Sequence, residues 1–353
     1  MSLVIIKYVS SAKKREDEDE IIIWMKDKTL KIAISGFILI IIISPFAASF
    51  LHISKILYMI LIAISFIFSL MTVANRSILQ GLLRFKDMVI SLLVEGLTKL
   101  ALCGVLVYFG FAVGGAMIGW VISIIAGWYL TNLYIDKKKV KINKFDAKPI
   151  LLFAMPVLLQ SISATSLYSS DLILVKHFFS SHDAGIYAAL STLGMIIFFA
   201  TGPIGAVMFP FISQKSAAGS DYKKIFIFSF CATAFSAFCL LGIYWINPQF
   251  IVKLLYGSLY IEAANLLVWF SVFITLFTLS NLIITLNLSL GKTNVVIFPV
   301  VAASLQILGI YFYHNNLFQV IMVSILATAL LLSFLLIYSS YGNKAAFSNR
   351  PGL

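Results

Sequence analysis

Ten long apolar runs divide this chain of 353 residues, and they limit its possible folds more than any other feature. Each run is long enough to cross a lipid bilayer as a helix, which needs about 20 mostly apolar residues. The runs lie at 30–51, 56–74, 88–109, 113–134, 150–170, 184–212, 225–246, 262–289, 294–313 and 317–339. Since a spanning segment must satisfy its own backbone hydrogen bonds, the runs predict an all-α polytopic membrane protein with about ten transmembrane helices.

The lysines and arginines are concentrated in alternate gaps between these runs. The N-terminal segment and every second gap after it hold 21 of the 26 basic residues, and the other five gaps hold 3. Basic residues in short loops mark the cytoplasmic side of a membrane protein. The pattern therefore predicts that both termini are cytoplasmic, which requires an even number of spans. The remaining two, Lys31 and Lys99, lie inside apolar runs.

The composition excludes a large soluble domain and several functions. Apolar residues make up 61% of the chain, charged residues 11%, and the mean hydropathy is +1.02. Anionic lipid beside cytoplasmic loops accounts for the net charge of +12, so nucleic-acid binding is not expected. The three cysteines lie within apolar runs, so neither a disulfide nor a metal site is expected. No nucleotide-binding loop is present, and neither a cofactor nor catalytic residues are expected.

The densest cluster of lysines predicts the boundary between two lobes. Residues 136–149 form a basic cytoplasmic linker, with an N-lobe of four spans at 30–135 and a C-lobe of six spans at 150–340. A cytoplasmic segment, 1–29, precedes the lobes, and a cytoplasmic tail, 341–353, follows them. Many transporters consist of two repeats with equal numbers of spans. The four-plus-six division therefore predicts that the N-lobe lacks its first two helices.

Two of the cytoplasmic segments contain patterns of their own. The acidic run 16–20 is typical of a solvated loop that leads into the start of an interfacial helix. Residues 75–87 combine three basic residues with apolar residues at roughly helical spacing. This second pattern predicts a short amphipathic helix that lies in the cytoplasmic interface.

Ionisable residues inside spans are costly, and this chain has few of them. Glu95 and Lys99 are four residues apart in the third span, the spacing of an ion pair along one helix. One interpretation is a self-neutralising pair without a functional role. The other is a proton or cation site, or a positive charge that faces an anionic head group.

The second half of the fifth span is unusually polar. It contains Gln160, five serines, Thr165 and Tyr168, and it ends with Asp171, followed by further apolar residues and then Lys176. A half-span with this many polar residues cannot face lipid. It should therefore face a water-filled cavity or partner helices. Asp171 either lines such a cavity within the bundle or caps the end of its helix.

Several stretches resemble the polysaccharide-repeat flippases of the multidrug/oligosaccharidyl-lipid/polysaccharide (MOP) exporter superfamily. They are ILQGLLRF at 78–85, DLILVKHFF at 171–179 with AGIY at 184–187, and FPFIS at 209–213. The opening IKYVS at 6–10 is similar to the linker after that family's second helix. The resemblance covers nearly the whole chain and implies two lobes that move a lipid-linked oligosaccharide across the bacterial cytoplasmic (inner) membrane, for O-antigen, lipopolysaccharide or capsule synthesis.

The resemblance also suggests which residues contact the substrate. A substrate linked to undecaprenyl pyrophosphate requires a cationic or polar cavity. The candidates for substrate binding are Lys99, Asp171, Gln160, Lys176 and Arg76. Glu95 and Asp171 are the candidates for coupling to a proton or sodium ion. An alternative is an ion-coupled multidrug or organic-cation antiporter of the same superfamily, and a polymerase or ligase is disfavoured because the outer gaps are short.

Overall fold

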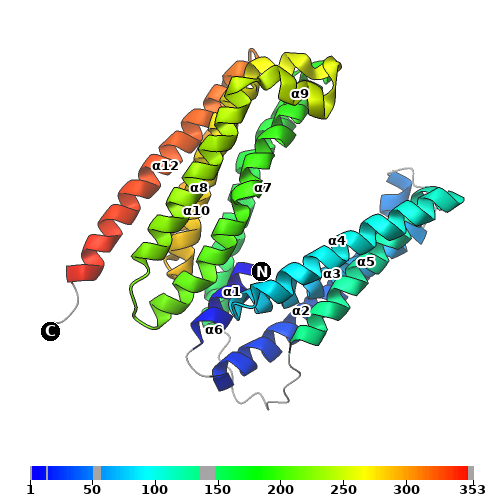
Figure 1. Ribbon diagram of the computed structural model, residues 1–353, viewed down its shortest axis with the longest axis vertical. Coiled ribbons are helices and arrows are strands. Elements are labelled where there is room, and N and C mark those ends of the chain that lie inside the picture. Colours follow the sequence, from blue (N-terminus) through cyan, green and yellow to red (C-terminus); the bar gives the residue numbers. More distant parts are fainter. Residues whose placement is uncertain (1, 13–14, 51–56, 136–147, 349–353) are drawn as a thin grey trace. The chain divides into compact units, whose positions relative to one another are not determined.

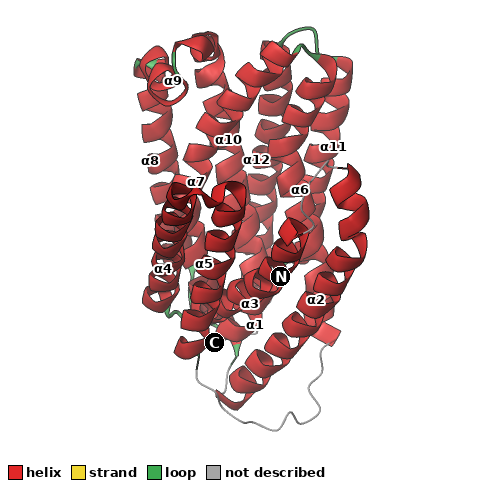
Figure 2. Cartoon of the chain, turned by 90° about the vertical axis from the view of Figure 1, so that its right-hand side faces the viewer, coloured by secondary structure: helices red, strands yellow, loops and turns green. Residues whose placement is uncertain are grey.

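The computed structural model describes residues 2–12, 15–50, 57–135 and 148–348 (Figure 1). Helices joined by short loops make up this part of the chain, and Figure 2 shows no strand among the described residues. The chain divides into two compact units, residues 1–148 and 149–353. The all-α fold predicted from the apolar runs is confirmed. The predicted basic linker, 136–149, lies outside the described residues apart from its last two positions.

Unit 1 consists of helices that pack along their length. They are α1 (Ser2–Ser11), α2 (Arg15–Phe50), α3 (Leu57–Gly81), α4 (Phe85–Leu106), the π-helical turn η1 (Val107–Phe111) and α5 (Ala112–Tyr134). The helices α4 and α5 form an antiparallel hairpin and lie side by side (Figure 1). The Cys103 thiol donates a hydrogen bond to the carbonyl of Ala116 at 3.2 Å. A Cβ added to Gly119 would lie 2.7 Å from the Cys103 backbone nitrogen, so only glycine permits this approach.

The turn between α4 and α5 explains the number of membrane crossings. Nine helical segments of the described residues are long and apolar enough to span a membrane, and one of them, Phe85–Tyr134, has 50 residues. Within it, Gly110 has φ of 87° and Ala112 has φ of 44°, so the backbone leaves the helical conformation and the chain reverses direction. This segment therefore supplies two crossings, and the nine candidates account for the ten predicted runs.

The N-terminal segment corrects one prediction. It is helical instead of a solvated loop, because α2 begins at Arg15 and places Glu16, Asp17 and Glu18 in its first turn. Acidic side chains are favourable there because the N-terminus of a helix carries partial positive charge. The preceding α1 packs its apolar face on the end of α3, and Val9 lies against Gly81. Residues 2–11 and 16–29 therefore belong to the packed body of unit 1.

The predicted interfacial helix at 75–87 is also wrong. The first part of this segment is the last two turns of α3, and a short turn at 82–84 connects α3 directly to α4. Leu83 has φ of 60° in this turn, and the Arg84 amide donates to the Leu79 carbonyl at 2.8 Å. Ile78 and Leu79 are fully buried, so the apolar residues that suggested an amphipathic surface helix pack within unit 1.

In unit 2, several helices pack around one central helix. Its helices are α6 (Lys148–Phe178), α7 (Ser181–Ala217), α8 (Lys223–Ile246), α9 (Pro248–Tyr256), η2 (Ser258–Ala263), α10 (Ala264–Ser289), η3 (Thr293–Val296), α11 (Ile297–Phe312) and α12 (Leu317–Ser348). The helix α10 contacts α7, α8 and α12, and Figure 1 shows it among them. Phe270, Phe273 and Phe277 of α10 are almost completely buried, so aromatic packing forms the centre of this unit. The gap predicted at 171–183 is shorter than expected, since α6 continues to Phe178.

Candidate functional site

A buried carboxylate lies inside unit 2. Asp171 is on α6, about two turns before the end of that helix, and its side chain is completely buried. The hydroxyl of Tyr187, on α7, donates to Asp171 Oδ2 at 2.7 Å, and the Leu172 amide donates to Asp171 Oδ1 at 2.8 Å. The structure therefore places Asp171 within the bundle, held by a neighbouring helix, instead of at a helix cap. Hydrogen bonds from two donors offset the cost of burying the carboxylate.

The same polar network reaches two more helices. Gln306 of α11 is fully buried, and its Nε2 donates to the Leu167 carbonyl at 3.1 Å and to Ser324 Oγ of α12 at 2.8 Å. Ser324 Oγ in turn donates to the Val320 carbonyl at 3.1 Å, and the Leu167 carbonyl lies one turn before Asp171 on α6. Gln306 Oε1 has no hydrogen-bond partner among the described residues. Four helices of unit 2 thus meet at one polar cluster, which retains an acceptor for a further hydrogen bond or a cation.

A polar stripe runs along the surface of α6. Ser161, Thr165 and Lys176 are exposed, and Ser169 is half-buried. At about 3.6 residues per turn, these four positions fall within an arc of roughly 80° on one face of the helix. Gln160 lies on another side of α6, where it is 5% exposed and its Oε1 lacks a partner in the described part of the chain. The stripe gives this spanning helix a face with hydroxyl groups and one ammonium group.

The ionisable residues of unit 1 form a pair that differs from the predicted one. Arg76 of α3 donates through Nη2 to Glu95 Oε2 of α4 at 2.7 Å. It also donates through Nε to Ser91 Oγ at 2.9 Å and through Nη2 to the Ser91 carbonyl at 3.0 Å. The predicted Glu95–Lys99 ion pair along α4 is therefore wrong. The guanidinium of Arg76 binds several oxygens in fixed geometry, and a flexible lysine one turn away does not offer this arrangement.

A glycine on a third helix leaves room for this ion pair. Gly127 of α5 is buried, and a Cβ there would lie 2.7 Å from Glu95 Oε2 and 3.2 Å from Arg76 Nη2. The side chains of Arg76 and Glu95 remain 15% and 22% exposed. Helices α3, α4 and α5 therefore enclose the pair on most sides, and the open side allows contact with a ligand or water.

The two candidate lysines lie away from these networks. Lys99 is exposed on α4, one turn beyond Glu95, and it pairs with no carboxylate in the part of the chain that the structure describes. Lys176 is exposed near the end of α6. The structure therefore brings Arg76 and Glu95 together, whereas Lys99 and Lys176 remain exposed cations on unit 1 and unit 2.

Several residues of these networks were missed in the sequence. Three of them, Ser91, Gly127 and Tyr187, contact a candidate residue from another helix, and the fourth, Ser324, accepts a hydrogen bond from Gln306. Their sequence separation from Asp171 or Arg76 follows no helical period, so no spacing pattern could identify them. The described residues contain no cluster of three or more His, Cys, Asp or Glu that could hold a metal ion.

Comparison of the sequence with known families gives one match. The model of a family described as polysaccharide biosynthesis protein matches residues 1–216, more than half of the chain. No curated protein matches the sequence of this chain.

Solved structures with a similar fold cover almost the whole chain. A MATE transporter in complex with MaD5 has a TM-score of 0.83 at 13% identity, and the match covers 99% of this chain and 84% of that one. An outward-facing multidrug resistance MATE transporter of the MOP superfamily has a TM-score of 0.80 at 12% identity, over 99% and 84% of the two chains. A MOP superfamily transporter from Pyrococcus furiosus, described as having a binding pocket of reversed polarity, has a TM-score of 0.72 at 13% identity, over 96% and 82%. At these identities the similarity shows the fold.

Proposed function

The chain belongs to the polysaccharide biosynthesis protein family and has the fold of MOP superfamily transporters, and from this premise we propose that it is a flippase for a lipid-linked oligosaccharide. The substrate is a repeat unit linked to undecaprenyl pyrophosphate, for a surface polysaccharide such as O-antigen or capsule. The chain moves it across the bacterial cytoplasmic membrane by alternating access between two lobes, with both termini in the cytoplasm.

The polar stripe on α6 is the observation that carries this proposal. Ser161, Thr165 and Ser169 present hydroxyl groups along a helix that crosses the membrane. Sugars are recognised by hydrogen bonds to their hydroxyl groups, and a lipid-facing helix has no use for such a stripe. An apolar organic cation would be better served by aromatic and acidic side chains, which this stripe lacks.

The candidate residues divide by the chemistry that each can offer. Lys99, Arg76 and Lys176 are the proposed contacts of the pyrophosphate, because cationic groups form strong charge-assisted hydrogen bonds with phosphate oxygens. Gln160 and Asp171 are the proposed polar contacts of the sugar chain. Glu95 and Asp171 are also the proposed sites of a coupling proton or sodium ion. A carboxylate within a spanning helix is energetically costly, and such residues commonly mark ion pathways in membrane proteins.

Lys99 gives the most direct test of these roles, because its side chain makes no ion pair with any residue that the structure describes. In Lys99→Ala, we expect flipping to fall by about tenfold or more, the effect of losing one hydrogen bond to a charged group. Protein abundance and thermal stability should remain unchanged. Lys86→Ala, at the start of α4, is a matched control for the loss of one positive charge. Normal flipping by Lys99→Ala would remove this residue from the proposed site.

The alternative function is an ion-coupled multidrug antiporter. The observation that favours it is the similarity of the fold to a transporter described as multidrug resistant, together with the buried Asp171. The two functions differ in their substrate, so one preparation can test both.

The experiment uses the full chain reconstituted in liposomes. Flipping of a fluorescent undecaprenyl-pyrophosphate oligosaccharide is measured by the fraction that an external quencher can reach. Ethidium transport under a proton or sodium gradient is measured in the same vesicles. We expect transfer of the lipid-linked sugar and no gradient-driven ethidium transport. Ethidium transport without transfer of the lipid-linked sugar would overturn the proposal in favour of the antiporter.

A further inference from the structure

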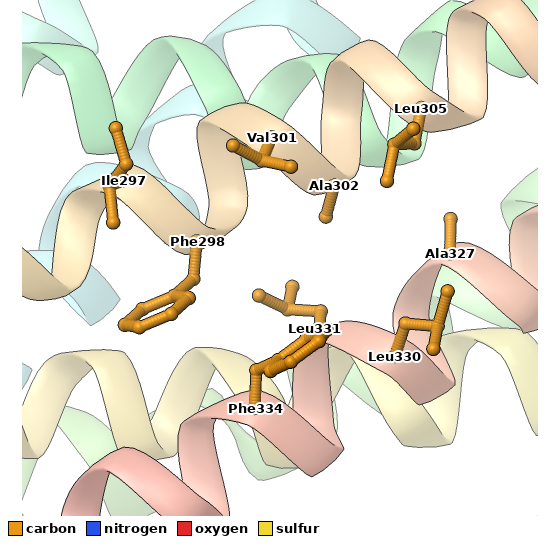
Figure 3. A pocket seen from close by; sticks show the side chains of 9 residues that line it. All are labelled: Ile297, Phe298, Val301, Ala302, Leu305, Ala327, Leu330, Leu331 and Phe334. Carbon is orange, nitrogen blue, oxygen red and sulfur yellow. The ribbon is translucent and has the colours of Figure 1, made fainter.

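An apolar groove lies between α11 and α12, and on α11 it extends from Ile297 to Leu305, the residue before Gln306. Its volume is about 270 Å³, and nine residues line it, five of α11 between Ile297 and Leu305 and four of α12 between Ala327 and Phe334 (Figure 3). All nine side chains are apolar. The groove therefore offers contacts to hydrocarbon and none to a polar ligand.

Small residues at the floor create the groove. Ala302 of α11 and Ala327 of α12 are 4% and 5% exposed, and both point into the open space in Figure 3. Leu305, Leu330 and Phe334 at the rim are about half exposed, at 50%, 50% and 54%. The two methyl groups are too short to fill the space between the helices. A leucine at either alanine position would occupy it.

The groove begins at a positively charged end of α11. Ile297 is both the first residue of α11 and part of the lining, and Lys292 precedes it by five residues. The positive-inside rule places the turn that contains Lys292 at the cytoplasmic surface. From Ile297 to Leu305 the helix rises about 12 Å at 1.5 Å per residue. The groove therefore extends through most of the cytoplasmic leaflet, which is about half of a hydrocarbon core roughly 30 Å thick.

We propose that this groove binds the polyprenyl tail of the lipid-linked substrate, in the part of the tail next to the pyrophosphate. This inference rests on the proposed function, since it assigns the hydrocarbon portion of the same substrate. The apolar walls match an isoprenoid chain. The positive charge of Lys292, five residues before the groove, matches the negative charge of the pyrophosphate at the membrane surface. The hydroxyl stripe of α6 and this groove thus serve the sugar and the lipid portions respectively.

The first experiment identifies the occupant. The full chain in lipid nanodiscs is irradiated with a polyprenyl phosphate that carries a diazirine in its first isoprene units, and the labelled peptides are identified by mass spectrometry. We expect labels on 297–305 and 327–334. Excess unlabelled polyprenyl phosphate should reduce the labelling, whereas an equal excess of phosphatidylglycerol should not. Equal displacement by phosphatidylglycerol would overturn the proposal and make the groove a general lipid site.

The second experiment fills the groove. In Ala302→Leu and Ala327→Leu we expect labelling to fall by about tenfold, the loss that corresponds to about 1.4 kcal/mol of binding free energy. Ser304→Leu is the matched control, because Ser304 is exposed on α11 and does not line the groove. If Ala302→Leu or Ala327→Leu does not fold, Lys292→Gln provides an independent test. It leaves the helix packing intact, and it should weaken labelling because it removes a positive charge near the groove. Unchanged labelling in every folded variant would contradict the proposal.

Flipping by the same variants separates this inference from the function on which it rests. If the wild-type chain flips the lipid-linked oligosaccharide and the groove-filling variants flip it equally well, the groove proposal is wrong and the flippase proposal stands. If the wild-type chain does not flip it, the proposed function fails. Labelling of the groove by polyprenyl phosphate then still reports whether the groove binds this lipid.

Discussion

Asp171 combines full burial, a membrane-spanning helix and a hydrogen-bond donor from a second helix. Tyr187→Phe removes that donor and leaves the buried carboxylate with the Leu172 amide. We expect a loss of about 1–3 kcal/mol of stability, measured as a lower unfolding temperature in detergent, because an unsatisfied buried acceptor costs its desolvation free energy. Asp171→Asn keeps the shape and an acceptor oxygen, so we expect it to fold and to lose ion-coupled transport.

A double-mutant cycle measures the contribution of the Tyr187–Asp171 hydrogen bond to stability separately from the contribution of the surrounding packing. If the Tyr187–Asp171 hydrogen bond is the cause, Tyr187→Phe should cost less stability in the Asp171→Asn background than in the wild type. Additive losses in the two backgrounds would contradict this assignment. Tyr244→Phe is a useful comparison, since the Tyr244 hydroxyl donates to the backbone carbonyl of Leu193 at 2.8 Å instead of to a carboxylate.

The Arg76–Glu95 pair depends on the absence of a side chain at Gly127. We expect Gly127→Ala to displace the Glu95 carboxylate from Arg76 and to lower the unfolding temperature. In a Glu95→Ala background Glu95 Oε2, the atom nearest to the added Cβ, is absent. The same substitution should therefore lower the unfolding temperature much less. Arg76→Lys should not restore the pair, because a lysine cannot donate to Ser91 and Glu95 in the same forked geometry. An equal cost of Gly127→Ala in both backgrounds would show that helix packing, and not the ion pair, requires the glycine.

At this scale the sequence located ionisable residues inside the spans, but the partner that it suggested for Glu95 is wrong. The cost of charge inside apolar runs singles out Glu95, Lys99 and Asp171 without any structure. Helical spacing suggested Lys99 as the partner of Glu95, but the structure uses Arg76 from the preceding helix. Partners on other helices depend on how the helices pack, and a single sequence contains no period that reports it.

At the scale of elements, the apolar runs located the helices but not their ends. Hydropathy predicted a boundary wherever charges begin, so it began the first apolar run at 30 and ended the second at 74. The structure extends α3 to Gly81 and begins α2 at Arg15, because packing and the helix dipole favour helix beyond the apolar core. The turn at 82–84 depends on a backbone conformation at Leu83 that composition does not predict.

The packing of α4 on α5 is testable through glycines that differ only in their surroundings. A Cβ at Gly119 would meet the Cys103 backbone, which cannot rotate away, whereas Gly96 of α4 has nothing within 4 Å. We expect Gly119→Ala to separate the hairpin and lower the unfolding temperature. Gly96→Ala should be neutral or stabilise the protein by up to about 1 kcal/mol, because alanine favours helix more than glycine. Equal behaviour of the two variants would contradict the close approach at Cys103.

At the scale of the whole molecule, two features of the sequence predicted two different properties, the fold class and the family. The apolar runs were sufficient to predict an all-α polytopic protein, and the quoted motifs were sufficient to predict its family. The Asp171 network and the Arg76 pair lie in separate compact units, each built from several helices. Each unit therefore stabilises its own buried or half-buried charged group through contacts between its own helices.

The predicted orientation in the membrane can be tested with single cysteines in a variant that lacks Cys103, Cys231 and Cys239. Ser220→Cys lies in the exposed turn between α7 and α8, next to basic residues, and Asn315→Cys lies in the exposed turn between α11 and α12. The positive-inside rule predicts that an impermeant maleimide added to intact cells labels the cysteine at 315 and not the one at 220. Both should react after the membrane is permeabilised, which controls for burial. The reverse pattern in intact cells would place both termini outside the cytoplasm and, with them, the mouth of the α11–α12 groove in the opposite leaflet.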